Sequence, residues 1–157
     1  MQWKHVDLLA KRWLVPDTKA SRPLVVPLSD AAVAILKKIK AMGLHSELVF
    51  PSSIIPDCGM GKNQMLQLLQ SHHPGLAVHG FRASFRKWAS NQVNDRGVRD
   101  YSSDVVESVL AHEVKGGNKV QMAYDDPIQL KMRRGVLAAW SEFVTTPPAK
   151  VIPMIAA

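Results

Sequence analysis

The spacing of the apolar residues changes once along the chain, close to residue 29, and this change constrains the fold most. Before it, short runs rich in Val, Leu and Trp are separated by turn-forming residues; the runs are 3–9, 12–15 and 22–27. Runs of this length between turns favour a small antiparallel meander. After residue 29, apolar residues recur at helical intervals. The pattern predicts an α+β domain, mostly helical, with a small antiparallel three-stranded sheet near the N-terminus.

The first helix has the clearest signals, because Ser29 and Asp30 form a capping pair and Gly43 supplies a stop. A later helix, over 79–93, should have an aromatic face and a basic face; its residues at helical spacing are Phe81, Phe85, Trp88 and Ala89, with Arg82, Arg86 and Lys87 between them. Asp104 and Glu107 resemble a capping box. The spacing predicts helices over about 30–42, 62–69, 79–93, 104–112, 119–124 and 127–144.

Length and composition set further limits. The 157 residues suit one domain, which we place at residues 1–145, followed by a proline-containing tail over 146–157. The single cysteine, Cys58, excludes an internal disulfide and a cysteine-based zinc cluster. No apolar run is long enough for a membrane span, and the first residues lack the pattern of a secretory signal. We therefore expect no membrane partner and a cytoplasmic location.

The charge is positive and unevenly distributed. The chain carries a formal net charge of +7, which is typical of a protein that binds nucleic acid. Residues 79–99 contain five basic side chains and one acidic one, whereas residues 100–126 contain two basic and six acidic. This segregation favours a basic face built by residues 1–22 and 79–99. Ordinary solvated surface is the alternative explanation.

Three short motifs carry candidate chemistry. His79 and Arg82 stand three residues apart at the start of a predicted helix, where an anion would meet both side chains and the positive end of the dipole. A capping histidine beside a surface arginine explains the same pair. His112 ends an apolar helix, where it would also be a simple cap. Tyr124 lies between two predicted helices beside two aspartates, an unusual place for a tyrosine that only packs.

The order His-x-x-Arg, Leu-Ala-His, Ala-Tyr resembles the tyrosine recombinase (phage integrase) family, and the resemblance covers nearly the whole chain. Residues 3–8 resemble the strand after the family's first catalytic arginine, and residues 19–29 resemble its lysine-bearing hairpin and the Pro-Leu-Ser entry to the next helix. Residues 79–85, 110–112 and 118–124 are most similar to the P4-like integrases of prophages and genomic islands. The resemblance implies the fold of DNA breaking-rejoining enzymes.

The resemblance implies DNA cleavage and rejoining without a metal or other cofactor. Tyr124 would attack a phosphodiester, form a 3′-phosphotyrosyl link and release a 5′-hydroxyl. Arg82 and His112 would stabilise the negative charge on the non-bridging oxygens. His79 would assist proton transfer from the tyrosine, and Lys19 would protonate the leaving oxygen as general acid.

The same resemblance implies partners. The substrate would be double-stranded DNA with attachment sites, and the full-length protein would assemble as a homo-oligomer on that DNA in the bacterial cytoplasm. The residues that we expect to contact DNA are Lys19, Arg22, Arg82, Arg86 and Lys87.

The chain departs from the family pattern at its start. The pattern includes a further arginine, in an RxxE-type helix before the strand that residues 3–8 resemble, and the chain begins at Met1 without it. Arg12 and Arg22 lie within the meander and do not take that role. Ala111 stands where many members have glycine. We therefore expect an amino-terminally incomplete catalytic domain that binds DNA weakly and catalyses poorly alone.

Two other classes of function stay open from the residues. A catalytically silent DNA-binding module would use residues 79–99 as a phosphate-contacting face. A histidine-based hydrolase or metal protein would depend on His72, His73 and His79, whose spacing matches no strong ligand pattern, so we expect no metal site.

The tail over 146–157 alternates prolines with Val151, Ile152, Met154 and Ile155. Related recombinases pass such segments to neighbouring protomers, which makes tail exchange one expectation. Folding back onto its own chain is the alternative, and a disordered end is a third.

Overall fold

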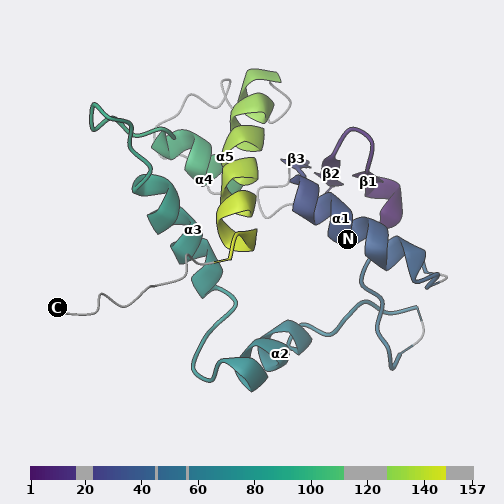
Figure 1. Ribbon diagram of the computed structural model, residues 1–157. Coiled ribbons are helices and arrows are strands. Elements are labelled where there is room, and N and C mark those ends of the chain that lie inside the picture. Colours follow the sequence, from purple (N-terminus) through teal and green to yellow (C-terminus); the bar gives the residue numbers. More distant parts are fainter. Residues whose placement is uncertain (17–22, 45, 56, 112–126, 148–157) are drawn as a thin grey trace.

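A computed structural model describes residues 1–16, 23–44, 46–55, 57–111 and 127–147 of the chain. Within these residues, a three-stranded antiparallel sheet is combined with one 3-10 helix and five α-helices (Figure 1). The expected α+β class, mostly helical with a small sheet near the N-terminus, is therefore confirmed. The predicted helix over 119–124 and most of the tail lie outside the described residues.

The sheet orders its strands along the chain as β1, Val6–Asp7, β2, Arg12–Val15, and β3, Leu24–Pro27. The expected first strand over 3–9 is too long, because Trp3–His5 form a 3-10 helix, η1. The N–H of Trp3 donates to the carbonyl of Glu47 at 2.9 Å, which removes it from the pairing with β2. Strand pairing begins only where Val6 faces Trp13.

Helix α1, Asp30–Ala41, begins where the capping pair predicts. The Ser29 hydroxyl oxygen accepts a hydrogen bond at 3.3 Å from a first-turn N–H. Val33 and Leu36 are buried, three residues apart on one face. Gly43 follows with φ +65°, a left-handed conformation that ends helices and that glycine adopts readily.

Helix α2, Gln64–His72, starts and ends later than the predicted 62–69. None of its residues is buried, and Figure 1 shows it apart from the sheet and from the other helices. Met65 and Leu68 are consequently more than half exposed. The element is amphipathic in sequence but has no partner within the described part of the chain.

The main hydrophobic core lies between α3, Gly80–Ser90, α4, Ser103–Val109, and α5, Pro127–Thr145. The expected aromatic face of α3 supplies Phe85 and Ala89, which are buried, whereas Phe81 is 56% exposed. The rest of the core consists of Val105, Val106, Leu110 and Val136, with Trp88, Tyr101, Val109 and Trp140 packed against it.

The cap of α4 differs from the expectation. Ser102 is the N-cap residue, and its hydroxyl oxygen accepts a hydrogen bond from the N–H of Val105 at 3.4 Å. Asp104 is therefore inside the helix, and the capping box predicted for Asp104 and Glu107 is wrong. Glu107 instead forms an ion pair with α3, described below.

Helix α5 joins the two parts of the fold. It packs against β3 and α1 on one side and against α3 and α4 on the other, as Figure 1 shows. Its bounds agree with the predicted 127–144, and Pro127 occupies the first turn, where proline is favoured. Although α5 has 19 residues, no helix of the described part is both long and apolar enough to cross a membrane.

Candidate functional site

The start of α3 carries two of the expected site residues. His79 is the residue before the helix; it is exposed, and its side chain caps none of the helix N–H groups. Arg82 lies in the first turn and is half-buried. Both side chains stand at the positive end of the helix dipole. The structure thus keeps the imidazole and the guanidinium at one end of the same element.

The backbone donors expected at this helix end are occupied. The N–H groups of Gly80, Phe81 and Arg82 donate to the carbonyls of Ala77, Val78 and His79 at 2.9, 3.2 and 3.1 Å. The residue before the helix is already in helical conformation, with φ −62° and ψ −27°. These N–H groups are therefore already bonded within the chain, and the groups left to meet an anion here are the side chains of His79 and Arg82.

Arg82 connects two of the three motifs. Its guanidinium Nη2 donates to the carbonyl oxygen of Leu110, 28 residues later in the chain. Leu110 is the C-cap residue of α4 and the first residue of the Leu-Ala-His motif. A cation is favoured there, because the last carbonyls of a helix form the negative end of its dipole. The bond holds the His-x-x-Arg motif beside the Leu-Ala-His motif.

The chain turns sharply after this contact. Ala111 has φ +54°, the left-handed conformation that favours glycine. The helix that was expected to reach His112 ends at Val109 for this reason. The turn also gives a physical reason why a glycine suits this position, which is where many members of the resembled family have one.

A second arginine of α3, Arg86, forms an ion pair with another helix of the protein. Nε and Nη2 of Arg86 donate to the two carboxylate oxygens of Glu107 at 2.7 and 2.9 Å. This bidentate pair ties α3 to α4 and raises the pKa of Arg86, because the carboxylate stabilises the charged form. The neighbouring Lys87 is exposed and has no ion-pair partner among the described residues. Both side chains are exposed, and of these two predicted DNA contacts only Arg86 has a charged partner among the described residues.

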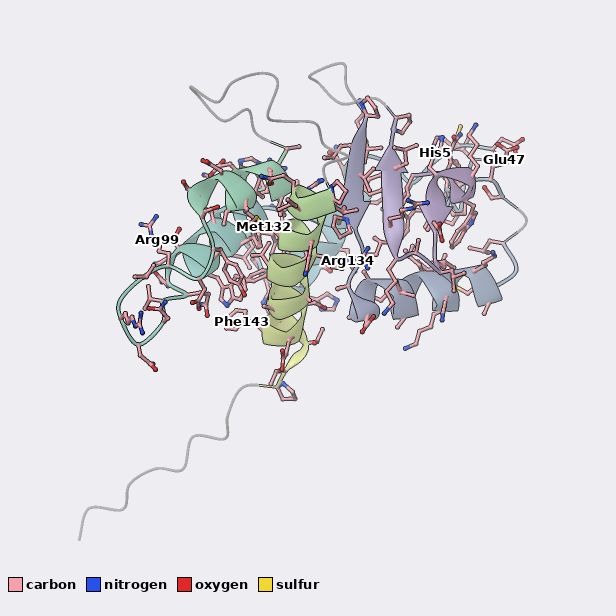
Figure 2. All side chains as sticks on the ribbon, turned by 90° about the horizontal axis from the view of Figure 1, so that it is seen from above. His5, Glu47, Arg99, Met132, Arg134 and Phe143 are labelled. Atoms are coloured by element: carbon pink, nitrogen blue, oxygen red, sulfur yellow. The ribbon has the colours of Figure 1, made fainter. Side chains whose placement is uncertain are left out.

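The basic surface continues into the loop after α3. The Asn94 side-chain oxygen accepts hydrogen bonds from the N–H groups of Arg96 and Val98 at 3.0 and 3.1 Å, and Gly97 turns the chain with φ +73°. Arg96 and Arg99 are exposed, and Figure 2 shows Arg99 on the outer side of this loop. A structured loop therefore presents two further cations to solvent.

Four expected site residues, Lys19, Arg22, His112 and Tyr124, lie outside the described residues. Their roles stay predictions. The elements that follow two of them are described: β3 begins five residues after Lys19, and α5 begins three residues after Tyr124. The element that follows Lys19 is β3 and the element that follows Tyr124 is α5, and these two elements pack against each other.

The contact between α5 and β3 contains a residue that the sequence reasoning missed. Arg133 is 2% exposed, and its Nη1 donates to the carbonyl of Val25 at 2.7 Å. A signal was present, because Arg133 shares a helix face with Val136 and Trp140, three and seven residues later. Glu107 was predicted only as part of a capping box, and its ion pair with Arg86 was not expected.

The other tyrosine of the chain is a packing residue. The ring of Tyr101 lies 5.9 Å from that of Trp88, centroid to centroid, at the edge of the core. Burial raises the pKa of Tyr101, followed by the effect of the nearby Asp100 charge. The position of Tyr101 is therefore explained by its packing against Trp88 at the edge of the core.

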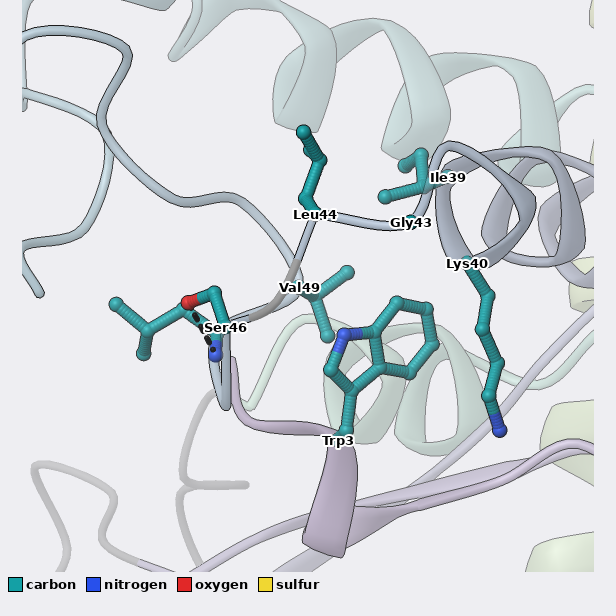
Figure 3. Close-up of a pocket in the computed structure, with 8 residues that line it drawn as sticks. Trp3, Ile39, Lys40, Gly43, Leu44, Ser46 and Val49 are labelled. Atoms are coloured by element: carbon teal, nitrogen blue, oxygen red, sulfur yellow. Dashed lines mark hydrogen bonds between the residues drawn. The ribbon is translucent and has the colours of Figure 1, made fainter.

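A small cavity lies away from these residues. It has a volume of about 230 Å³ and is lined by Trp3, by the last turn of α1 and by residues between 43 and 49 (Figure 3). The ring centroid of Trp3 is 5.7 Å from Nζ of Lys40. None of the expected site residues lines it. Within the described part of the chain, no three His, Cys, Asp or Glu side chains are grouped as metal ligands.

The chain is similar to integrases over nearly its whole length. Prophage integrase IntA of Escherichia coli K12 is 34% identical over 147 residues, which cover 91% of this chain and 33% of that protein. Prophage integrase IntZ of the same strain is 32% identical over 147 residues, covering 91% and 34%. The integrase of enterobacteria phage P4 is 24% identical over 153 residues, covering 97% and 34%.

The chain spans about one third of the length of the curated relatives it matches. No protein-family model matches it, and no solved structure does. The resemblance inferred from the order of the motifs is nevertheless confirmed, because three separately named integrases align with at least nine tenths of the chain. These similarities support a phage integrase (tyrosine recombinase) family for the chain.

Proposed function

We propose that residues 1–145 are the carboxy-terminal catalytic part of a site-specific DNA recombinase, which integrates or excises a mobile element. The names of the relatives support this reaction class. The observation that carries the proposal is the hydrogen bond from Arg82 to Leu110, because it brings two motifs 28 residues apart into one basic site. Residues 146–157 would form a separate tail.

Tyr124 is the proposed nucleophile. Its hydroxyl oxygen forms a bond to phosphorus, the bond from phosphorus to the 5′-oxygen breaks, and the DNA is left joined to the protein through a 3′-phosphotyrosyl link. The energy of the phosphodiester is conserved in that link, so a 5′-hydroxyl of another strand is able to reverse the reaction. The packing of Tyr101 against Trp88 supports the choice of Tyr124 between the two tyrosines.

Arg82 is the proposed electrostatic clamp. Phosphoryl transfer spreads negative charge over the non-bridging oxygens, and a fixed guanidinium stabilises that charge without reorganising during the reaction. The bond to Leu110 supplies the fixed orientation. His112, two residues after Leu110, is the proposed second donor to a non-bridging oxygen.

Two proton transfers complete the proposed chemistry. His79 takes the proton of the Tyr124 hydroxyl, a role supported by its exposed imidazole, which is not used as a cap. Lys19 gives a proton to the leaving 5′-oxygen. No metal or other cofactor takes part in these steps, which would occur on DNA in the bacterial cytoplasm.

The proposed DNA contacts come from the basic segments. Lys19, Arg22, Arg82, Arg86 and Lys87 would contact phosphates, with Arg86 held in place by Glu107. Double-stranded attachment-site DNA is the proposed substrate, and a homo-oligomer on that DNA, with exchange of the tail between copies, is the proposed assembly. Because the chain spans about one third of the length of its relatives, it is proposed to react more slowly alone than a whole relative does.

The proposal is tested by replacing each of the two tyrosines with phenylalanine. The chain is incubated with nicked duplex DNA that carries the sequence shared by both ends of its element, and covalent adducts are separated on a denaturing gel. We expect a slow adduct from the unaltered chain and from Tyr101→Phe, and none from Tyr124→Phe. A gel-shift assay should show equal DNA binding by all three proteins.

Tyr101→Phe is the matched control, since it removes the same hydroxyl from the other tyrosine. An adduct that persists in Tyr124→Phe contradicts the proposal. A catalytically silent DNA-binding module predicts equal DNA binding and no adduct from any of the three proteins.

A further inference from the structure

Arg133 is a buried charge in the middle of α5. Its side chain is 2% exposed and lies on the same helix face as Val136, which is fully buried in the core. Burying a guanidinium is costly unless it forms hydrogen bonds. Arg133 meets this need in part through β3, because its Nη1 donates to the carbonyl of Val25 at 2.7 Å. This bond joins residues 108 positions apart in the sequence.

The contact lies at the junction of two parts of the fold. One part is the sheet with α1, the other is α3 with α4, and α5 packs against both. Val136 fixes α5 in the core that α3 and α4 share. On the sheet side, polar contacts come from Arg133 and from the exposed Arg134, whose Nη2 donates to the carbonyl of Ala10 at 3.2 Å. Figure 2 shows Arg134 reaching from α5 toward the sheet.

The two proposed reacting groups belong to different parts. Lys19 precedes β3, in the sheet part, and Tyr124 precedes α5, which the core holds to α3 and to Arg82. We infer that Arg133 is a positioning residue: through Val25 it fixes the strand that follows Lys19 relative to the helix that follows Tyr124. The inference rests on the proposed function and adds a residue to which that function gave no role.

The chemistry makes the inference specific. When Tyr124 attacks, the electron pair of the broken bond stays on the 5′-oxygen, which takes the proton of Lys19. Loss of Arg133 would leave α5 packed against α3 and α4 and would release only the sheet part, so the step expected to fail is protonation of the leaving group. A bridging sulfur in place of the 5′-oxygen needs no acid, because thiols have a pKa of about 8.5 and leave as thiolates.

The experiment compares oxygen and sulfur leaving groups in single-turnover adduct formation by the full chain. Arg133→Met removes the donors and keeps an unbranched side chain. We expect Arg133→Met to slow the reaction of the oxygen substrate at least about tenfold and that of the sulfur substrate less than about twofold. Arg134→Met, the matched control on the neighbouring residue, should change both rates less than about twofold. Arg133→Lys, which keeps a donor, should recover part of the loss.

Two results would overturn the inference. One is an equal loss on both substrates in Arg133→Met, which would place its effect on Tyr124 or on the whole fold. The other is the same selective loss in Arg134→Met. The variant Lys19→Ala distinguishes these results from a failure of the proposed function. If Lys19 is the general acid, Lys19→Ala should react slowly with the oxygen substrate and at the normal rate with the sulfur substrate. This result does not depend on the role of Arg133.

Hydrogen exchange gives a readout that needs no catalysis. In Arg133→Met, the amides of β2 and β3 should exchange faster while those of α3 and α4 keep their protection. Unchanged exchange in the sheet contradicts the inference, and so does an equal increase in all elements.

Discussion

At the scale of single residues, the turn after α4 depends on a backbone conformation that alanine disfavours. Ala111 has φ +54°, which costs a residue with a β-carbon about 1–2 kcal/mol. Glycine removes this strain but gains entropy in the unfolded chain. We therefore expect Ala111→Gly to raise the free energy of unfolding by about 0.5–1 kcal/mol, measured by urea denaturation.

Ala83 offers a control of opposite sign. It is exposed inside α3, where glycine has no strain to relieve. Ala83→Gly should lower the free energy of unfolding by about 1 kcal/mol. If both substitutions destabilise the chain equally, the turn at Ala111 is not strained.

At the scale of elements, the turn between β1 and β2 depends on an ionised side chain. The pKa of Asp7 lies below its ordinary value, because its carboxylate accepts the N–H of Ala10 at 2.8 Å and lies 3.4 Å from Nη2 of Arg12. Such a group stabilises the fold above the pKa of the unfolded chain, about 3.9, and this stabilisation disappears as pH falls through the lower folded value.

The expected outcome is a pH-dependent effect of Asp7→Asn. The substitution keeps the shape and removes the charge, so it should lower Tm at pH 7, and the difference should shrink as pH falls below the ordinary pKa of the carboxyl. Thermal unfolding of both proteins between pH 7 and pH 2.5 measures this. A difference in Tm that stays constant across the range would show that the charge of Asp7 does not stabilise the turn.

The elements were predictable where their signals are local. Ser29 and Gly43 bound α1, and the change of apolar spacing separates the sheet from the helices. The predicted strand over 3–9 was too long, because Trp3 of η1 forms a hydrogen bond with Glu47, which lies more than 40 residues away in the sequence.

The candidate site was predictable as a set of motifs but not as an arrangement. Arg82 meets Leu110 across 28 residues, Arg86 meets Glu107 across 21, and Arg133 meets Val25 across 108. Residue spacing along one element carries no information about such partners. The spacing does indicate on which helix face a side chain lies, and it places Arg133 on the same face as Val136 and Trp140.

At the scale of the whole molecule, the charge and the proposed nucleophile are in different segments. Five of the basic residues lie in 79–99, around Arg82, whereas Tyr124 belongs to a segment with six acidic residues. Attraction between local charges therefore does not bring Tyr124 to a phosphate. The fold has to do so, and α5 is the element that follows Tyr124 and packs against both the sheet and the core.

Mass spectrometry of the covalent adduct identifies which side chain is joined to DNA. Trypsin cleaves after Lys119 and Lys131, so Tyr124 lies in the peptide 120–131, and Tyr101 lies in the peptide 100–115. After nuclease digestion, we expect a nucleotide remnant on Tyr124 in peptide 120–131. A remnant on Tyr101, or on any residue other than Tyr124, would contradict this expectation.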